Sequence, residues 1–466
     1  MLDYKLKIGL LPVRRWIKEP PKRYGIFQSD YAVENKKKCV AYIKEHFTDE
    51  ITEFVDIDFL NEEGLLFLEE DCDRVTEYFQ SQKIDALFVI NCNFGMENVV
   101  GLVASRLRLP TLLWGPRDRN FSEGIRYTDT QCGLFAISKQ LKRANVKFTY
   151  IENCDIESDV FAEGMKKFFS VATMVRNFKN MTVLQVGTRI KPFESIMYNE
   201  LELKEKFNVH IKIFNLAEAV EELNKIYAER QKELEQGLVA LKQTFDCGTL
   251  DDATLKKMLA VALYYEDLAN KYNCNVISGE CWTGVTLGWG ANPCLAMCLL
   301  AAKNIFVTCE WDMHMTITNI LLLSASRGKA KPIQGEFTCR HPENENAELL
   351  WHCGPFPLEY KDENCKPYLY NTKPSFKLKD GQYTIARFQC ANGKYYLLGG
   401  SFHTCDGPET FGTYMWAQFK DLPKLERKII EGPYIHHMTE IPGDYTAELE
   451  EFCKYIDDIQ FDKLED

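Results

Sequence analysis

The chain contains no apolar stretch long enough to cross a membrane. Among its 466 residues, the longest apolar stretches include Leu295–Ala302 and Ile320–Leu323, and Lys303 or Ser324 interrupts each of them. A transmembrane helix needs roughly 20 apolar residues in a row. The first residues, Met1–Lys5, lead directly into a strand-like run and lack the cationic and apolar parts of a signal peptide. We therefore expect a soluble, cytoplasmic protein with no membrane partner.

An excess of positive charge is also absent. The chain has 56 Lys+Arg against 68 Asp+Glu, which gives a net charge of -12. This balance excludes a broad electrostatic surface for nucleic acid or anionic lipid. Hydrophobic residues make up 45% of the chain, a share that excludes a disordered protein. Small molecules are therefore the expected partners.

Several motifs with well-known chemistry are missing. Neither GxGxxG nor GxxxxGK[ST] occurs, so the sequence carries no nucleotide-binding fingerprint. No CxxC pair occurs among the 17 cysteines, and Cys294 and Cys298 lie four residues apart on an apolar helix. A zinc ribbon or a thioredoxin-type site is therefore not expected. In the cytoplasm the cysteines should be reduced thiols.

The first two-thirds of the chain predict a parallel α/β structure. Strand-like apolar runs alternate with helical patterns, a βαβ order that implies parallel sheets with right-handed crossovers. The predicted strands are 7–12, 84–90, 111–114, 181–187 and 209–214, and the predicted helices are 31–46, 96–107 and 193–206. We place a domain boundary near residue 172, between the two cycles of this pattern.

Long helices and then short strands follow. Apolar positions from 216 to 245 keep steps of three, four and seven, and a second helix is predicted at 255–272, with Asp251 or Asp252 as its cap. After Gly328 the prolines and glycines multiply, and the runs 383–388 and 394–398 flank the turn signal Ala391-Asn392-Gly393. A helix at 445–456 closes the chain. We predict two α/β domains, 1–172 and 173–330, and an antiparallel β-rich domain, 331–466.

Three predicted strands end in a loop that carries an arginine. These loops contain Arg14, Arg117 and Arg189. In open α/β sheets, ligands bind beyond the carboxyl ends of the strands, so the three arginines could line one cleft. Guanidinium groups there could orient sugar hydroxyls or bind a phosphate, sulfonate or carboxylate. Alternatively, each arginine ties its own loop to a neighbouring acid.

The densest set of potential ligands begins at an apolar strand, 305–308. It is followed by Glu310 and Asp312, which would point to the same face if the strand continued. That spacing suits two oxygen ligands, or one ligand and a base. Alternatively, Asp312 caps the helix that follows at 316–324, and Glu310 pairs with one of the arginines.

Further ligand candidates lie far along the chain. His352 precedes a Cys-Gly pair, and His436 and His437 follow a turn. Neighbouring residues on a strand face opposite ways, so only one of the adjacent pair is expected to reach a given metal. Two carboxylates with one or two histidines form a hard, oxygen-rich site that suits Mn²⁺ or Mg²⁺ better than zinc.

Five short motifs occur in order along the chain: Cys281-Trp282, Asn292-Pro293-Cys294, Cys309-Glu310-Trp311-Asp312, Trp351-His352-Cys353-Gly354 and Gly432-Pro433-Tyr434-Ile435-His436-His437. Together they resemble the L-fucose/L-arabinose isomerase family, most strongly from residue 275 to 440. The resemblance implies two Rossmann-like, doubly wound α/β domains and a barrel-like C-terminal domain. It also implies a homo-oligomer, a trimer or hexamer, and aldose–ketose isomerisation with Mn²⁺, or with Mg²⁺ or Co²⁺.

The resemblance assigns a metal site by position. Asp312 matches the acidic metal ligand of the fucose branch, and Glu310 matches the corresponding glutamate of the arabinose branch. His437 or His436 matches the C-terminal histidine ligand of both branches. His352 falls in a segment where the arabinose branch has another histidine ligand, although the spacing differs.

One family residue has no counterpart. The family has a further catalytic, metal-binding glutamate where this chain reads Asn292-Pro293-Cys294-Leu295, without an acid. Glu280 is the nearest acidic substitute. We expect Asp312 and His437 to hold the ion, and Glu310 or Glu280 to move the proton of an enediolate mechanism.

The substrate is expected to be a monosaccharide. Trp282 and Trp416 are candidates for an aromatic wall against the sugar, although core packing explains Trp282 equally well. Two alternatives stay open. The enzyme could isomerise or epimerise a sulfonated, phosphorylated or acidic sugar, with the three arginines as an anion clamp. Alternatively, the chain is a sugar-binding relative that has lost the chemistry.

Overall fold

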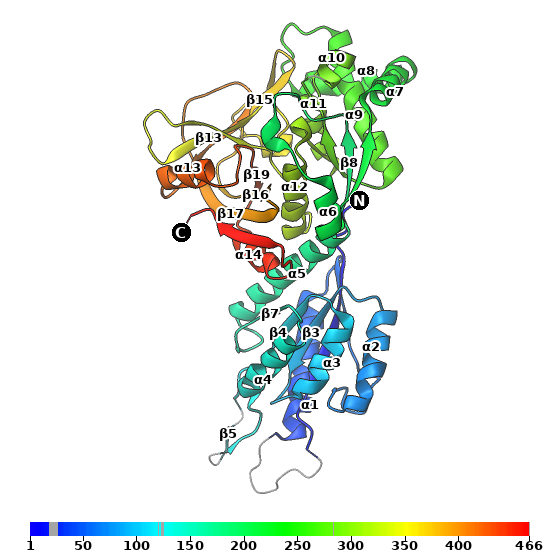
Figure 1. Cartoon of the computed structure of the whole chain (residues 1–466), viewed down its shortest axis with the longest axis vertical. Coiled ribbons are helices and arrows are strands. Elements are labelled where there is room, and N and C mark those ends of the chain that lie inside the picture. Colours follow the sequence, from blue (N-terminus) through cyan, green and yellow to red (C-terminus); the bar gives the residue numbers. More distant parts are fainter. Residues whose placement is uncertain (18–26, 120, 123–124, 283, 466) are drawn as a thin grey trace. The chain divides into compact units, whose positions relative to one another are not determined.

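The computed structural model describes residues 1–17, 27–119, 121–122, 125–282 and 284–465 (Figure 1). Two compact units make up the chain. The N-terminal unit is Tyr4–Arg176, and the C-terminal unit is Asn177–Asp466 together with Met1–Asp3. No helix among the described residues combines the length and the apolar character that a membrane crossing requires.

The N-terminal unit contains a five-stranded parallel sheet in the order β2-β1-β3-β4-β7. Every residue of β3 is buried, as expected for a strand that helices cover on both faces. The predicted strands and helices are present here. The strands are β1 Leu6–Val13, β2 Thr52–Val55, β3 Ala86–Asn91, β4 Thr111–Trp114 and β7 Phe148–Tyr150, with a small hairpin of β5 Phe121–Ser122 and β6 Ile125–Arg126.

Five α-helices accompany this sheet. They are α1 Ser29–Phe47, α2 Cys72–Ser81, α3 Glu97–Leu107, α4 Thr130–Arg143 and α5 Asp159–Lys179. Side chains of α5, including Phe161, Met165 and Phe168, share one core cluster with β1, β3 and β4. A second cluster contains side chains of α2, α3 and α4. The sheet therefore has apolar cores on both of its faces.

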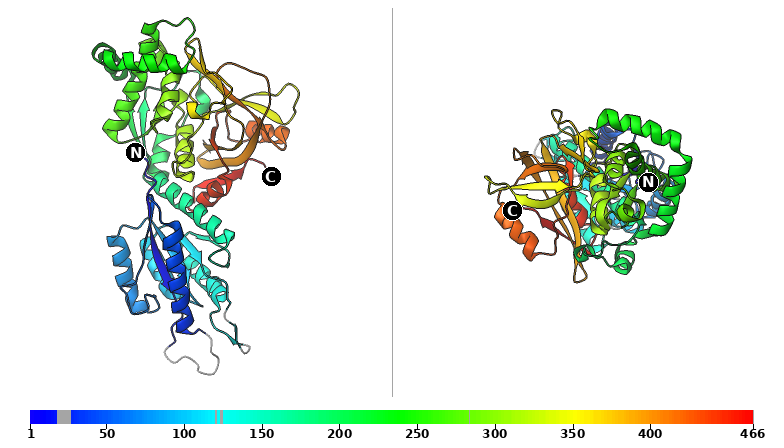
Figure 2. Two further views of the ribbon diagram at one scale, coloured as in Figure 1. Left: turned by 180° about the vertical axis from the view of Figure 1, so that it is seen from behind. Right: turned by 90° about the horizontal axis from the view of Figure 1, so that it is seen from above.

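The C-terminal unit begins with a four-stranded parallel sheet in the order β11-β10-β8-β9. Its strands are β8 Thr182–Val186, β9 His210–Phe214, β10 Val276–Gly279 and β11 Phe306–Thr308. The helices of this part, drawn in green in Figure 2, gather beside the sheet. They are α6 Glu200–Phe207, α7 Leu216–Glu229, α8 Gln231–Thr244, α9 Asp252–Tyr272, α10 Val285–Trp289, α11 Cys294–Ala301 and α12 Met313–Ala325.

Two helix predictions need correction. The single helix expected from 216 to 245 is two helices, because the backbone of Arg230 leaves the helical region at φ -104 and ψ 37. The guanidinium of Arg230 binds Glu233 and Asp267 at this break. The apolar spacing continues through the break, which is why the sequence pattern reads as one helix. The helix expected at 193–206 begins only at Glu200, after a short 3-10 turn, Glu194–Ile196.

A nine-stranded sheet fills the last third of the chain. Its pairs are antiparallel, except for β15 with β18 and β17 with β20, which are parallel. The strands are β12 Glu336–Arg340, β13 Ala347–His352, β14 Tyr368–Tyr370, β15 Lys373–Lys377, β16 Gln382–Ala391, β17 Lys394–Cys405, β18 Thr413–Gln418, β19 Thr439–Pro442 and β20 Ile459–Lys463. Helices α13 Leu422–Glu431 and α14 Thr446–Cys453 accompany them.

The predicted hairpin is present, and the closing helix is followed by an unpredicted strand. Asn392 and Gly393 form the two-residue turn between β16 and β17, with φ values of 54 and 72. Helix α14 corresponds to the helix expected at 445–456. After it the chain continues into β20, which pairs with β17. The prediction of parallel α/β structure followed by a largely antiparallel sheet is therefore confirmed in outline.

Helix α12 joins the two sheets of the C-terminal unit. All 13 of its residues are buried, including Thr316, Thr318 and Asn319. It lies against β10 and β11 of the parallel sheet and against β16 and β19 of the large sheet (Figure 1). A helix that is buried on every side needs an apolar sequence all round, as the run Ile320–Leu323 provides. The start of α12 therefore lies where both sheets can contribute side chains.

Candidate functional site

The segment between β11 and α12 does not continue the strand. Strand β11 ends at Thr308, and Cys309–Trp311 form a 3-10 turn in which Glu310 and Trp311 have φ values of 63 and 64. The prediction that Glu310 and Asp312 share one face of a strand is therefore wrong. Both carboxylates nevertheless approach the same imidazole, that of His437, because the turn brings them there.

Asp312 is fully buried, and its carboxylate is saturated with hydrogen bonds. Arg387 donates to both of its oxygens, at 2.7 and 3.2 Å, and the Met315 N–H donates at 3.0 Å as the cap of α12. His437 Nδ1 lies 2.9 Å from Oδ2. Burial raises the pKa of Asp312, but Arg387 and His437 outweigh that effect and hold the pKa far below its ordinary value.

His437 lies between two carboxylates. Its Nδ1 faces Asp312, and its Nε2 is 3.1 Å from Glu310 Oε2. Burial lowers the pKa of His437, but Asp312 and Glu310 outweigh burial and raise the pKa to about 9. Nε2 is buried and lacks a partner with hydrogen-bond geometry, although Glu310 is so close. A buried nitrogen in this situation calls for a ligand or an ion.

A third carboxylate and a second imidazole border the same nitrogen. Glu336 Oε2 lies 3.7 Å from His437 Nε2 and 3.6 Å from His436 Nε2. The two histidine rings are 4.4 Å apart, because the chain bends at residue 436 and does not form a strand there. Burial raises the pKa of Glu336 and lowers the pKa of His436 to about 4. We call Glu310, Glu336, His436 and His437 the carboxylate–histidine cluster.

The carboxylate–histidine cluster fits a divalent cation, and Asp312 does not. One donor atom each of Glu336, His436 and His437 lies within 4.8 Å of the others, a spacing that one ion can span. The unpartnered Nε2 of His437 points to Glu310. The oxygens of Asp312 are already occupied, and the guanidinium of Arg387 would repel a second cation beside them. Asp312 instead orients His437, as carboxylates behind metal-bound histidines do.

Glu280 holds a loop. It is 5% exposed, and its Oε2 accepts a hydrogen bond from the Thr188 N–H at 2.7 Å. A side chain at Gly187 would collide with this carboxylate, and Gly187 has a φ of +81. The loop in turn accepts a hydrogen bond from Trp311 Nε1 at the carbonyl of Gly187. Glu280 therefore contributes to the position of the loop at 187–193 beside the turn that carries Glu310.

The two tryptophans occupy different surroundings. Trp282 is 52% exposed, and its ring lies 5.2 Å from that of Phe193, which is itself 6.5 Å from the ring of His437. Trp282 can therefore contribute to a wall beside the cluster. Trp416 is instead buried, packs with Leu349, and donates from Nε1 to the carbonyl of Pro408. That environment is core packing, so the structure does not support the prediction of Trp416 as part of a wall against the sugar.

The three arginines are divided between the two units. Arg14 is buried in the N-terminal unit, where it binds Glu63 and stacks on Phe67. Arg117, also in that unit, is exposed and lies 3.5 Å from the carbonyl of Asn153. Arg189 is in the C-terminal unit, on the loop that Glu280 holds, and donates to the carbonyls of Ile190 and Lys191. A cleft shared by all three stays a prediction.

His352 lies among thiols. Its Nδ1 accepts a hydrogen bond from the Cys353 N–H at 2.8 Å and is 3.3 Å from Cys353 Sγ. Its ring is 6.3 Å from that of His437. Burial lowers the pKa of His352, but Cys353, Glu336 and Glu310 outweigh burial and raise the pKa to about 10. His352 therefore lies next to His437, and its Nδ1 already accepts a hydrogen bond from the Cys353 N–H.

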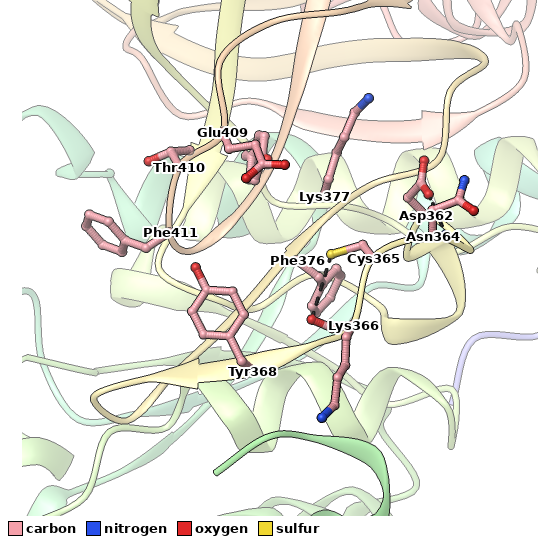
Figure 3. Close-up of a pocket in the computed structure, with 11 residues that line it drawn as sticks. Asp362, Asn364, Cys365, Lys366, Tyr368, Phe376, Lys377, Glu409, Thr410 and Phe411 are labelled. Carbon is pink, nitrogen blue, oxygen red and sulfur yellow. Dashed lines mark hydrogen bonds between the residues drawn. The ribbon is translucent and has the colours of Figure 1, made fainter. Parts of the chain in front are cut away.

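A pocket of about 690 Å³ lies apart from the carboxylate–histidine cluster (Figure 3). Tyr368, Phe411 and Tyr414 form its aromatic wall, and Lys366, Lys377 and Glu409 add charge. None of the residues predicted for the site lines it. On β13 and β18, His352 and Thr413 alternate with Trp351 and Tyr414, so the pocket belongs to the other face of the large sheet.

Sequence reasoning missed Arg387, Gln389 and Glu336. Arg387 and Gln389 continue the alternation of Tyr383 and Ile385 along β16, so a polar pair at an inward-facing position was a readable signal. Gln389 Oε1 accepts from Arg387 at 2.8 and 3.0 Å and fixes the guanidinium. Glu336 follows a glycine in a segment without periodicity, and no local pattern distinguishes it.

The fold and the cluster define a class of protein: an α/β protein whose polar centre lies beyond the carboxyl end of a parallel strand. The family model of the fucose/sulfoquinovose isomerase N-terminal domain matches residues 21–179. A sulfoquinovose isomerase of Alkalicoccus urumqiensis is 22% identical over 79% of this chain and 83% of its own length. A sulfoquinovose isomerase of Priestia aryabhattai is 20% identical over 83% of this chain and 87% of its own length. The chain is therefore similar to fucose/sulfoquinovose isomerases at low sequence identity.

Solved structures resemble the chain only distantly. An ABC transporter periplasmic solute-binding protein from Actinobacillus succinogenes 130z, with bound D-allose, is 12% identical, with a TM-score of 0.17. The match covers 70% of this chain and 93% of that one. Similarity at this level carries no argument about fold or function.

Proposed function

We propose that the protein is an aldose–ketose isomerase of an anionic monosaccharide, with the carboxylate–histidine cluster as its active site. The observation that carries the proposal is His437, held by Asp312 at Nδ1 and facing Glu310 and Glu336 with an unpartnered Nε2. Isomerisation moves one proton between neighbouring carbons, so it needs a carboxylate base and a charge that stabilises the enediolate. The cluster offers both.

Glu310, His436 and His437 would hold a divalent cation, with Mn²⁺ as the first candidate and Mg²⁺ or Co²⁺ as others, and Glu336 would lie beside the ion, because its carboxylate is within 4.8 Å of both imidazoles. When bound, such an ion supplies positive charge that stabilises developing negative charge on the sugar oxygens. Arg387 and Asp312 act from behind: they fix the ring of His437 and keep its Nε2 directed into the cluster. The side chain of Glu310 is only 8% exposed, so in this proposal it binds the ion from the buried side of the cluster.

Glu336 moves the proton. Its side chain is more exposed than that of Glu310, at 18%, so it can meet the sugar from the open side of the cluster. Burial raises the pKa of Glu336 above its ordinary value, a direction that makes the carboxylate a stronger base. In this assignment, Glu336 removes the proton beside the carbonyl and delivers it to the adjacent carbon.

The loop at 187–193 supports an anionic substrate. It carries Arg189 and the exposed Lys191, and Phe193 of the same loop lies near His437. The curated relatives are named for sulfoquinovose, a hexose with a sulfonate group. A guanidinium and an ammonium on one loop suit a sulfonate, which offers three acceptor oxygens. We therefore expect sulfonated hexoses to be better substrates than neutral ones.

The test is proton exchange in deuterated water. Sulfonated, phosphorylated and neutral aldoses and ketoses are incubated with the protein and Mn²⁺, and nuclear magnetic resonance follows deuterium beside the carbonyl. We expect exchange with a sulfonated hexose and its loss, by at least 100-fold, in Glu310→Gln, Glu336→Gln and His437→Gln. Glu336→Gln should weaken Mn²⁺ binding less than Glu310→Gln does, because Glu336 also serves as the base in this assignment.

A control variant and two further outcomes make the test specific to the proposed site. Glu348→Gln alters another buried carboxylate with a raised pKa, on β13 and without a contact to His437, and it should keep full exchange. The double variant Arg189→Ala and Lys191→Ala should weaken the binding of the sulfonated substrate more than the binding of the neutral one. Absence of exchange with every sugar, together with binding of one of them, would show a sugar-binding relative without catalysis.

A further inference from the structure

Four cysteines from distant parts of the C-terminal unit converge in its core. Cys281 follows β10, Cys294 begins α11, Cys309 follows β11 and Cys353 follows β13. All four are buried, with exposures of 2, 3, 1 and 7%. We call them the thiol cluster. They are separated along the chain by between 13 and 44 residues, so no local spacing motif unites them.

Cys309 and Cys353 connect the four thiols. Cys294 Sγ lies 3.3 Å from Cys353 Sγ. Cys309 is the common neighbour, because its thiol lies within 4.8 Å of the thiols of Cys281 and Cys353 and also interacts with Cys294. All of these cysteines are free thiols in the structure. The four thiols therefore offer sulfur around Cys309, and two further donors lie beside them: His352 next to Cys309 and Cys353, and Glu310 next to Cys281 and Cys309.

The arrangement matches the needs of a soft metal ion. Zinc in structural sites takes four tetrahedral ligands at about 2.3 Å from sulfur, which places the sulfurs roughly 3.8 Å apart. The distance of 3.3 Å between Cys294 Sγ and Cys353 Sγ is below that value, and the distances from Cys309 Sγ to Cys281 Sγ and to Cys353 Sγ are at most 4.8 Å. Soft thiolates favour zinc over manganese or magnesium, so this site and the carboxylate–histidine cluster should select different metals.

We propose that Cys281, Cys294, Cys309 and Cys353 bind one Zn²⁺ ion per chain as a structural site. Binding releases the thiol protons to solvent, and no oxidation takes place, so the step needs no further reactant. The ion would connect the ends of β10 and β11 in the parallel sheet with the end of β13 in the large sheet. The ion would also fix the turn that carries Glu310, because Glu310 directly follows Cys309.

The first measurement is the metal content of the full chain. Protein incubated with Zn²⁺ and exchanged into metal-free buffer should retain one zinc per chain by elemental analysis. Replacement by Co²⁺ should give an intense thiolate-to-cobalt absorption band in the near ultraviolet. Absence of retained zinc, or a cobalt spectrum without the thiolate band, overturns the proposal. Neither readout depends on enzyme activity.

Variants locate the ion. Cys294→Ser and Cys353→Ser should each reduce the retained zinc at least tenfold, whereas Cys298→Ser should retain it, because Cys298 is equally buried on the same helix α11 but outside the cluster. Zinc retained in both cluster variants would contradict the assignment. If those variants do not fold, the cobalt spectrum of the unaltered chain still decides.

Two further results distinguish a zinc site in the thiol cluster from a metal bound at the carboxylate–histidine cluster and from a disulfide. Glu310→Gln combined with His437→Gln should retain the zinc, so the proposal can stand if the proposed isomerase site fails. In denaturant with a chelator and without reductant, all 17 cysteines should titrate as thiols. A count lower by two would mean that the close pair Cys294 and Cys353 forms a disulfide, and the metal proposal would then be wrong.

Discussion

At the scale of single residues, the centre depends on a buried ion pair. Arg387 and Asp312 are both fully buried, and they bind through two hydrogen bonds of 2.7 and 3.2 Å. A buried pair of this kind adds little net stability, but the removal of one partner leaves an uncompensated charge in the core. Its function here is orientation, because Asp312 holds Nδ1 of His437.

Replacement of the arginine tests this view of the pair. We expect Arg387→Met to reduce the free energy of unfolding by about 3–5 kcal/mol, because the carboxylate of Asp312 would stay buried without a cation. Urea denaturation at pH 7 gives the value. Arg340→Met, which removes an arginine that pairs with Glu345 and Glu426 at the surface, should cost less than about 1 kcal/mol. Equal effects of the two substitutions would contradict the prediction.

Glu440 predicts a pH dependence of stability. Burial raises its pKa to about 8, from an ordinary value of 4.5, although the Gly335 N–H donates to it at 2.9 Å. The folded state therefore holds this proton more tightly than the unfolded state does. The resulting stabilisation is complete below about pH 4.5 and is lost as the pH rises to about 8.

The comparison of wild type with Glu440→Gln isolates this proton. Between pH 4.5 and 8, the wild type should lose stability relative to the variant, by up to about 4 kcal/mol. Urea denaturation of both proteins across this range provides the difference. A difference that does not change with pH, or one that changes in the opposite direction, would show that Glu440 is ionised in the folded protein.

Single residues also mark the limit of prediction from the sequence. The approach of Glu310 and Asp312 to His437 could be proposed, because the residue types suit a common chemistry. The role of Asp312 could not be assigned, since it depends on Arg387, which lies 75 residues away. Glu336 is likewise brought to the cluster by an isolated bridge between its backbone and that of His437, which leaves no local signal.

At the scale of elements, turns and strand ends were the most predictable features. The signal Ala391-Asn392-Gly393 gives the hairpin because both turn residues need a positive φ, which asparagine and glycine tolerate. The break at Arg230 and strand β20 were not predictable. The first keeps the apolar spacing of one helix, and the second depends on a parallel partner, β17, that lies more than 50 residues earlier.

The hairpin turn makes an element-scale prediction. Gly393 has a φ of +72, a conformation in which a side chain is strained, although an added Cβ would meet only Glu202 Oε1 in ordinary contact, at 3.5 Å. We expect Gly393→Ala to lower the free energy of unfolding by about 1–2 kcal/mol. Gly381→Ala, at a glycine without a positive φ at the other end of β16, should have little effect. Thermal unfolding of the two variants tests the contrast, and equal shifts would refute it.

At the scale of the whole molecule, the sequence predicted the type of each sheet. Apolar runs in Ile84–Ile90 indicate burial on two faces, and such strands are parallel and covered by helices. The connection between the two sheets of the C-terminal unit was not predictable. It depends on α12, which is buried on every side, so its sequence has no apolar face that would indicate its neighbours. It also depends on one core cluster that extends across both sheets.

The division into two units predicts independent folding. We expect residues 4–176, expressed alone, to unfold cooperatively in a thermal melt followed by circular dichroism, because the unit has apolar cores on both faces of its sheet. Residues 4–150 should not fold, since they lack α5 and the side chains of Phe161, Met165 and Phe168 in the core. A melt without a cooperative transition for the longer fragment would contradict the prediction.

The left-handed backbone at Glu310 and Trp311 places stability and the proposed activity in conflict. A carboxylate-bearing residue in that conformation costs roughly 1–2 kcal/mol relative to glycine. A laboratory selection for heat tolerance alone should therefore enrich glycine or asparagine at position 310. The survivors would be more heat-resistant proteins that lack the carboxylate facing His437 Nε2.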